Sequence, residues 1–437
     1  MPAKLKVAFV VHEFPVLSET FIINQAIGLI DRGCEVDIYA TQLGDTDKMH
    51  PDVERYDLLD RVRLLPQVSP SYGLRLLKGI ELVAKFGYRH PEQILESLNL
   101  FKRGRRAASL WSLFTAVPAL SWPSYDIIHC QFGNLGFQGL LLKDFNPSAK
   151  LIVMFRGFDI SQQLKTEGDR FYKSLFCQAD FFLTNCEFFR QRLLKLGCDR
   201  NKVRVHYSGL DCAKFPLTVR SFDQAAEGAS NSPIRIAATG RLVEKKGFEY
   251  SIWAMAQVVR RYPHVTYDII GDGPLRKKLA ALIESLNLQE NVHLLGWRDE
   301  AEIIEVLTRS HLFVAPSVTS AAGNQDAPVN VLKEAMALGL PVVSTYHGGI
   351  PELVEHDISG LLVPERDASA IAQALFTLIE SPERWAAMGQ AGRAYVETHY
   401  GLDTLNDRLL DLYQELLQSD VDIAPKIPML STAIHLP

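Results

Sequence analysis

The sequence predicts an α/β protein of two doubly wound domains, each a parallel sheet covered by helices on both faces, that face each other across a cleft. Three observations support this prediction. Short apolar runs of strand length alternate with helical patterns along most of the chain, which is typical of parallel sheets. A polar, turn-rich stretch at 216–233 separates two such series. The length of 437 residues suits two or three domains.

The first unit is a strand, a helix and a second strand. Residues 6–11 form a short apolar run, and Ser18 is expected to cap a helix whose apolar residues recur at helical spacing. Arg32 and Gly33 are expected to end this helix, because glycine accepts the left-handed geometry found there. Residues 36–40 form the next strand. A helix between two parallel strands is the βαβ unit.

The same alternation continues in both halves of the chain. Further strands are predicted in the first half at 125–129, 151–155, 180–184 and 202–205, and in the second half at 234–238, 265–270, 292–295, 312–315, 341–344 and 360–363. We therefore expect a Rossmann-like domain at 1–215, a linker at 216–233, a second Rossmann-like domain at 234–400, and a C-terminal amphipathic helix with a tail at 401–437.

The composition is that of a soluble globular protein, with 47% hydrophobic and 22% charged residues. A formal net charge of −5 argues against nucleic acid as a partner. The six cysteines include no Cys-x-x-Cys pair, which favours reduced thiols over disulfides or a zinc site. No apolar run is long enough for a signal-peptide core or a transmembrane helix. These observations predict a cytoplasmic protein.

One segment of the second domain places two carboxylates, Asp326 and Glu334, eight residues apart. Asn330 and Val331 lie at the start of the predicted helix that carries Glu334, where free N–H groups and the helix dipole favour a phosphate group. Glu334 lies one turn further in, where it can accept hydrogen bonds from a ribose diol. The alternative is an ordinary loop carboxylate followed by a solvated helix carboxylate.

Further candidates follow other predicted strands, where ligands of doubly wound sheets bind. Arg241 and Lys246 follow the strand at 234–238, and two cations on such a loop can stabilise a leaving nucleoside diphosphate. The alternative is an exposed basic loop. Gly273 lies in a Gly-Asp-Gly-Pro turn, and Trp297 follows the strand at 292–295. His129 ends a strand of the first domain, although a lone histidine is more often structural.

Together these segments resemble glycosyltransferase family 4, retaining enzymes of the GT-B fold. The family signature is a glutamate, seven residues, a second glutamate, Ala-Met-Ala and Gly-x-Pro-Val. Asp326 takes the first position here, one methylene shorter, and Glu334 takes the second. The loop 240–247 resembles the family's diphosphate clamp. Phe-Pro-x-x-Ser-Glu-Thr-Phe at 14–21 resembles a subgroup associated with exopolysaccharide assembly, including colanic-acid-type enzymes.

The resemblance implies a role for each matched residue. The first carboxylate contacts the donor sugar, the second holds the nucleotide ribose, the cations hold the diphosphate, and the histidine of Asp-x-x-His sits by the reacting sugar. Arg156 replaces a family histidine, so it can bind an anionic acceptor or a phosphate. The implied catalytic residues are His129, Arg241, Lys246 and Asp326, and the implied substrate-binding residues are Arg156, Gly273, Trp297, Asn330, Val331 and Glu334.

The implied activity is transfer of a sugar, with retention, from a nucleoside-diphosphate sugar to a hydroxyl of a glycan or polyprenyl-linked glycan. No metal or other cofactor is expected, because the two cations can replace a metal. Two alternatives stay open. One is a nucleotide-sugar 2-epimerase of the same fold. The other is a catalytically silent sugar-nucleotide-binding subunit, suggested by Asp326, Arg156 and Gln131, which depart from the family pattern.

Residues 65–120 match no specific family segment. They hold a basic cluster beside apolar residues, formed by Lys102, Arg103, Arg105 and Arg106. Such a combination can touch anionic lipid head groups. The alternative is an ordinary packed helical insertion. The first interpretation, with a lipid-linked acceptor, predicts peripheral contact with the anionic inner face of the plasma membrane.

Overall fold

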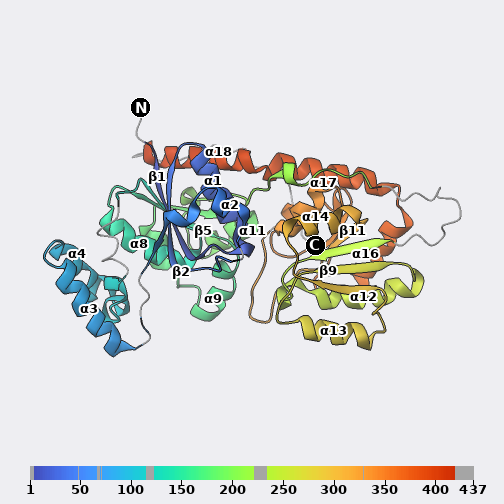
Figure 1. Cartoon of the computed structure of the whole chain (residues 1–437), viewed down its shortest axis with the longest axis horizontal. Coiled ribbons are helices and arrows are strands. Elements are labelled where there is room, and N and C mark those ends of the chain that lie inside the picture. Colours follow the sequence, from blue (N-terminus) through green and yellow to red (C-terminus); the bar gives the residue numbers. More distant parts are fainter. Residues whose placement is uncertain are drawn as a thin grey trace.

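The computed structural model describes residues 4–47, 49–65, 69, 71–114, 123–220, 234–327 and 329–418. These residues form two parallel sheets that lie side by side, with the first half of the chain around one sheet and the second half around the other (Figure 1). The predicted fold class, two Rossmann-like α/β domains, is confirmed. The predicted linker at 216–233 falls between the two halves in the sequence, and its residues 221–233 are outside the described ranges.

The first sheet has seven parallel strands in the order β3-β2-β1-β4-β5-β6-β7. Their bounds are β1 Lys6–Phe14, β2 Glu35–Leu43, β3 Val62–Leu64, β4 Ile127–Cys130, β5 Lys150–Phe155, β6 Phe181–Thr184 and β7 Val203–Val205. Alternate residues of β1 enter two separate cores. Ala8 and Val10 face one core, whereas Val7, Phe9 and Val11 face the other. Both faces of the sheet are therefore covered, as a doubly wound domain requires.

The second sheet has six parallel strands in the order β10-β9-β8-β11-β12-β13. Their bounds are β8 Arg235–Thr239, β9 Thr266–Ile270, β10 Val292–Gly296, β11 Leu312–Ala315, β12 Val342–Thr345 and β13 Gly360–Val363. Ile236 and Ala238 face one core and Ala237 faces the other. Each predicted strand is present, with ends that shift by a few residues.

Helices connect the strands and cover both sheets. In the first half they are α1 Thr20–Asp31, α2 Pro51–Arg55, α3 Tyr72–Phe86, α4 Pro91–Ser97, α5 Leu100–Arg103, α6 Arg105–Ala108, α8 Gly136–Phe145, α9 Gln162–Glu167, α10 Lys173–Gln178 and α11 Glu187–Lys195. In the second half they are α12 Phe248–Arg261, α13 Arg276–Ser285, α14 Glu300–Arg309, α15 Asn330–Ala337, α16 Ala368–Glu380, α17 Arg384–Tyr400 and α18 Leu402–Gln418. None of the helices in the described ranges is long and apolar enough to cross a membrane.

The start of α1 differs from the expectation. Ser18 does not cap it, because residues 17–19 form a short 3-10 turn and α1 begins only at Thr20, without a side-chain cap. The predicted end is correct. Gly33 takes a left-handed conformation with φ of +84°, and its N–H donates to the Ile30 carbonyl oxygen.

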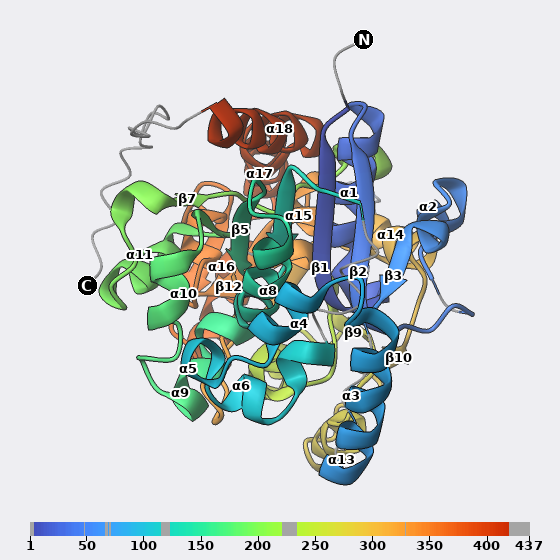
Figure 2. The same cartoon turned by 90° about the vertical axis from the view of Figure 1, so that its left-hand side faces the viewer.

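The C-terminal helices join the two domains. α17 packs on α15 of the second domain, and α18 then returns to pack on α1 of the first. Figure 2, turned by 90°, shows α18 lying along one edge of the first domain. The apolar face of α18 enters the core behind β1 through Leu409, Leu412, Tyr413 and Leu416. The amphipathic pattern predicts this helix but not the surface that it covers.

Candidate active site

The loops at the carboxyl ends of the two sheets meet each other. The loop between β11 and α15 reaches the first domain, where Arg192 donates to the Gln325 side-chain oxygen at 2.9 Å. The Gln325 N–H donates to the Ser161 hydroxyl at 3.2 Å, and Ala327 packs into the core of the first domain. The strand ends of both domains therefore border one region, as the two-domain arrangement predicts.

Glycines pack the strand-end loops of β8 and β9 closely together. A Cβ on Gly271 would lie 2.1 Å from the Gly240 carbonyl oxygen, and one on Gly273 would lie 2.7 Å from the Leu242 carbonyl oxygen. No side chain fits at either position. Gly273 thus supports the loop that carries Arg241. That it also binds substrate stays a prediction. Trp297 follows β10 and is 56% exposed.

Asp326 lies among the cations of this loop. Its two carboxylate oxygens bind the Nζ of Lys245 at 2.6 Å and the Nζ of Lys246 at 2.7 Å. The two ammonium groups hold the pKa of this buried carboxyl well below its usual range, despite the opposing effect of burial. Burial lowers the pKa of Lys246. The structure thus brings Asp326 and Lys246 together, and adds Lys245, which the sequence analysis missed although it adjoins Lys246.

His347 and Glu365, which were not predicted as site residues, hold the backbone of Asp326 in place. The Asp326 N–H donates to His347 Nε2 at 2.9 Å, and His347 Nδ1 contacts the Glu365 carboxylate at 2.6 Å. A Cβ on Gly348 would lie only 1.9 Å from the Asp326 carbonyl oxygen, so only glycine allows this approach. The Gly348-Gly349 pair in the sequence is the signal that marks this position.

Arg241 is exposed, and its guanidinium has no hydrogen-bond or ion-pair partner among the described residues. Glu19 of the first domain is close enough to be influenced by it. Burial raises the pKa of Glu19 to about 7, and Arg156 and Arg241 counteract that rise. A guanidinium of the second domain and a carboxyl group of the first are therefore near enough to influence each other.

The helix α15 carries the remaining candidates of the second domain. Its start has no side-chain cap, so the N–H groups of Asn330 and Val331 are left for another acceptor. Glu334, one turn later, is partly buried. Burial and the nearby carboxylate of Glu300 raise the pKa of Glu334 to about 7, and the adjacent Lys333 opposes them.

Arg156 is held by the first domain rather than left free. Its guanidinium donates to Gln131 Oε1 at 2.6 Å, to Ser208 Oγ at 3.1 Å and to Gln25 Oε1 at 3.3 Å, and it stacks 4.1 Å from the centroid of the Phe21 ring. Burial lowers the pKa of Arg156 to about 9. The group is therefore cationic at neutral pH, and within the described part of the chain no carboxylate forms an ion pair with it.

Asp159 organises the loops around Arg156. Its buried carboxylate accepts hydrogen bonds from the backbone N–H groups of Gly133, Arg156, Gly157 and Ile160 at 2.7–3.1 Å. Burial raises its pKa, although these hydrogen bonds oppose the rise. No role was predicted for Asp159, and the only signal for one was its place two residues after Gly157 at the end of a strand.

His129 does not line the region between the domains. Its ring is fully buried, Nδ1 lies 2.6 Å from the Tyr413 hydroxyl of α18, and its edge contacts Phe9. Nε2 is buried without a partner among the described residues. Burial, aided by the charge of Arg156, lowers the pKa of His129 well below its usual value. Its expected position beside the reacting sugar and its catalytic role both stay predictions.

Among the described residues, no group of three or more His, Cys, Asp and Glu side chains is placed to hold a metal ion. The cations that surround the strand ends are instead Arg241, Lys245 and Lys246. Such a group, next to the uncapped start of a helix, is suited to bind an anionic ligand.

Comparisons with known proteins agree with this geometry. The family model for Glycosyltransferase Family 4 matches residues 18–214, and the model for glycosyl transferases group 1 matches residues 219–395. The chain is 34% identical over 419 residues to WcaL of Escherichia coli (strain K12), named for colanic acid biosynthesis, with 94% of the chain and 100% of WcaL covered. It is 32% identical over 417 residues to the amylovoran biosynthesis glycosyltransferase AmsK of Erwinia amylovora, with the same coverage.

Solved structures show the same fold. Anabaena Alr3699/HepE, crystallised with UDP and glucose, aligns with a TM-score of 0.67 at 20% identity, over 94% of this chain and 100% of that one. Sucrose-phosphate synthase of Thermosynechococcus elongatus aligns with a TM-score of 0.66 at 20% identity, over 94% and 99% of the two chains. The fold is thus GT-B, and with relatives more than 30% identical over their full length, the chain belongs to the family 4 glycosyltransferases.

Proposed function

We propose that this glycosyltransferase takes its sugar from a nucleoside-diphosphate donor bound by the second domain. The observation that carries the proposal is the group of Arg241, Lys245 and Lys246 on one strand-end loop, where the two lysines share the single carboxylate of Asp326. A diphosphate supplies the negative charge that this group lacks. Glu334 lies on the helix with the uncapped start and is the candidate ligand for the ribose hydroxyls.

The same cations suit the chemistry of transfer. When the bond between the anomeric carbon and the diphosphate breaks, negative charge grows on the leaving phosphate oxygen, and Arg241 and Lys246 stabilise it. As the donor binds, Lys246 must leave Asp326 and contact the phosphate instead. The carboxylate oxygen that it leaves can then contact the sugar. We propose that the acceptor hydroxyl attacks from the face that the diphosphate leaves, so that the anomeric configuration is retained and the leaving phosphate takes the hydroxyl proton. These two side chains make a metal unnecessary in this proposal.

We infer that the acceptor is a glycan or polyprenyl-linked glycan of exopolysaccharide biosynthesis, used in the cytoplasm at the inner face of the plasma membrane. The names of WcaL and AmsK support the pathway. Arg156 supports an anionic acceptor, because its charge is balanced only by neutral groups at hydrogen-bond distance. Its donors are occupied, so it acts on an acceptor phosphate by its field rather than by direct contact.

A thermal-shift screen of nucleoside diphosphates and their sugars tests the donor. A ligand at a hundred times its dissociation constant adds about 2.7 kcal/mol of stability. Incubation of the stabilising donor with a glycan extract and a chelator then tests transfer. We expect a new glycosidic bond with the anomeric configuration of the donor. An epimerised nucleotide sugar, or binding without any turnover, would contradict the proposal and favour an epimerase or a silent subunit.

A further inference from the structure

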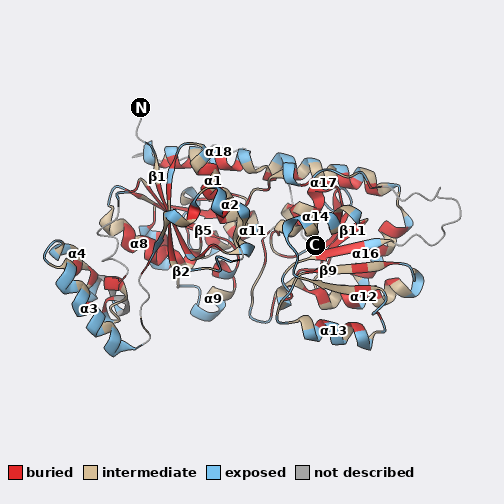
Figure 3. Cartoon of the chain, in the orientation of Figure 1, coloured by how far each residue is buried: buried red, intermediate tan, exposed pale blue. Residues whose placement is uncertain are grey.

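Helices α3 to α6 form an arm, defined as residues 72–114, that projects from the first domain (Figures 1 and 3). The arm has its own small core, formed by buried Ile94 and Leu113 with the partly buried Leu82, Phe86 and Leu98. The main core of the first domain is a separate cluster. The arm is thus a separately packed appendage. Its basic side chains at 102, 103, 105 and 106, on which the sequence analysis concentrated, lie outside the described residues.

The helix α3 is apolar on two opposite faces. Gly79, Leu82 and Phe86 face inward, toward the core of the arm. Leu74, Leu76, Leu77 and Ile80 spread over the outer face, with exposed fractions of 52%, 48%, 66% and 60%. A helix that is apolar on both sides is normally covered on both sides. We therefore expect the outer face of α3 to contact a partner.

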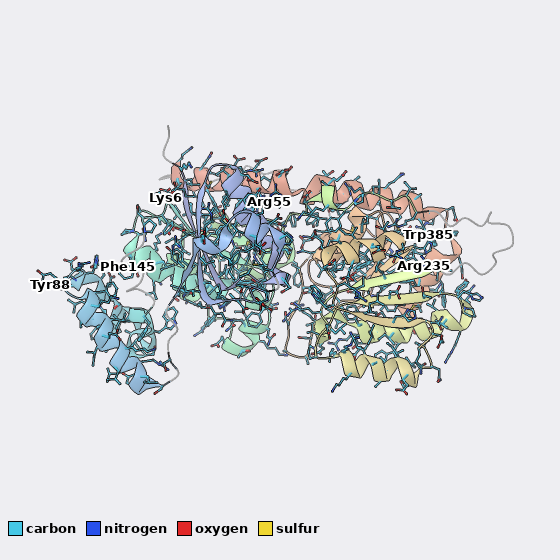
Figure 4. The ribbon with its side chains drawn as sticks, in the orientation of Figure 1. Lys6, Arg55, Tyr88, Phe145, Arg235 and Trp385 are labelled. Carbon is cyan, nitrogen blue, oxygen red and sulfur yellow. The ribbon has the colours of Figure 1, made fainter. Side chains whose placement is uncertain are left out.

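The arm also exposes aromatic side chains beyond α3. Tyr88 follows α3 and is 96% exposed, and Phe101 in α5 is fully exposed. Figure 4 shows Tyr88 at the extremity of the arm, away from both sheets. Large apolar side chains gathered on one surface are uncommon on soluble monomers and mark interaction sites. We call Leu74, Leu76, Leu77 and Ile80, together with Tyr88, the outer surface of the arm.

The arm is also strongly basic. Residues 72–114 contain eight lysines and arginines and three glutamates, a net charge of +5, whereas the whole chain has a net charge of −5. Lys78 and Lys85 are exposed on α3 itself, beside the outer surface. In the sequence, positive charge is therefore concentrated in the arm, and the rest of the chain is acidic.

The charge decides between possible partners of the outer surface. A second copy of the chain would bring two arms of net charge +5 together, which is unfavourable. An anionic lipid surface attracts the same lysines and arginines, and its interface accepts apolar and aromatic side chains. We propose that the outer surface of the arm docks the enzyme on an anionic lipid bilayer. This proposal rests on the proposed function in one respect: docking on a bilayer would bring the enzyme to a lipid-linked acceptor.

The test is co-sedimentation of the full chain with vesicles of phosphatidylcholine, alone or mixed with phosphatidylglycerol. We expect binding to the anionic vesicles only. Salt near about 0.5 M should release the protein, because the Debye length then falls to a few ångströms. Lys78→Glu with Lys85→Glu should weaken binding by roughly tenfold or more, since each basic residue near such a surface contributes about 1 kcal/mol. Leu76→Ser with Ile80→Ser should weaken it at unchanged charge.

Each variant has a matched control. Ile358→Ser removes an isoleucine of similar exposure, 56%, from the second domain, and Arg260→Glu with Lys277→Glu reverses two exposed charges there. These controls should bind vesicles like the unchanged protein. Thermal unfolding verifies that the arm variants are folded. Equal binding to both kinds of vesicle, binding to neither, or arm variants indistinguishable from their controls would overturn the proposal.

Two further measurements separate this proposal from its alternatives. Light scattering would reveal a dimer, and a dimer that Leu76→Ser with Ile80→Ser abolishes would identify a second copy as the occupant and overturn docking on lipid. Sugar transfer to a lipid-free glycan tests the proposed function alone and should not change in the arm variants. Transfer without vesicle binding refutes only the docking surface, whereas vesicle binding without transfer refutes only the proposed function.

Discussion

The strand ends of the two domains use their charged residues in opposite ways. In the second domain, Lys245 and Lys246 share the carboxylate of Asp326, and Arg241 is exposed without a partner among the described residues. In the first domain, Arg156 and Asp159 are buried and bound to neutral side chains and to backbone N–H groups. A ligand can displace one partner of an ion pair, but it cannot replace the internal hydrogen bonds of a loop without unfolding that loop. The second domain thus offers charge to a ligand, and the first domain uses charge to hold its shape.

The largest expected effect is on turnover, in the second domain. Arg241→Ala and Lys246→Ala should each lower kcat roughly 10²–10³-fold and change KM less, because charge on the diphosphate grows toward the transition state. Steady-state kinetics with the donor varied measure both constants. Lys277→Ala, which removes an exposed lysine of α13, serves as the control. A rise in KM alone would mean that the residue binds only the ground state. The cations of the second domain would then bind the donor without contributing to catalysis.

The matching change in the first domain should act on stability. Asp159→Asn replaces an acceptor of several backbone N–H groups by a side chain with one acceptor oxygen and donors of its own. We expect a loss of about 3 kcal/mol in the free energy of unfolding, since the N–H groups are left buried without partners. Urea unfolding measures this loss, and Asp169→Asn, on the surface of the same domain, should cost less than about 0.5 kcal/mol. Equal stability of the two variants would show that Asp159 does not hold the loops.

A somewhat smaller effect is expected on nucleotide binding. Glu334→Ala should weaken the binding of the nucleoside diphosphate by roughly 1.5–3 kcal/mol, because hydrogen bonds from the ribose to a carboxylate are lost. Calorimetry measures the affinity, with Glu290→Ala as an exposed control in the same domain. If the folded variant binds as well as the control, Glu334 does not hold the ribose.

The smallest expected effect concerns the pKa of the same residue. Burial raises the pKa of folded Glu334 to about 7, above its unfolded value, so the folded protein binds a proton more tightly than the unfolded chain. Stability from this group is present at acid pH and is lost as the pH rises through about 7. Glu334→Gln should therefore unfold at higher urea concentration than the unchanged protein at pH 8, by on the order of 1 kcal/mol after solvent screening. The difference should shrink as the pH falls and vanish only below the unfolded pKa of 4.5, and a reversed sign would exclude a raised pKa.

The fold could be predicted from the sequence because parallel strands buried on both faces leave continuous apolar runs. The same property left the orientation of His129 unpredicted. All four residues of β4 are buried, so no alternation of polar and apolar residues tells which face the histidine takes. Its neighbour is Tyr413, nearly three hundred positions away, and no local pattern indicates such a contact.

The candidate site of the second domain could be predicted in outline for a different reason. Its residues follow strands directly, so the topology alone places them at one edge of the sheet. What the sequence could not predict is which cations pair with Asp326. That depends on the loop between β11 and α15, whose path is set by contacts such as Gln325 with Arg192 in the other domain. Long-range contacts of this kind leave no trace in local spacing.

The position of α18 has a consequence for synthesis of the protein on the ribosome. The first domain cannot complete its core until Leu409, Leu412, Tyr413 and Leu416 have emerged, although its sheet ends at Val205. At typical rates of translation the roughly two hundred intervening residues take about 10–40 s. During that time the nascent first domain exposes the apolar groove behind β1, a binding site for chaperones that exists only before the chain is finished.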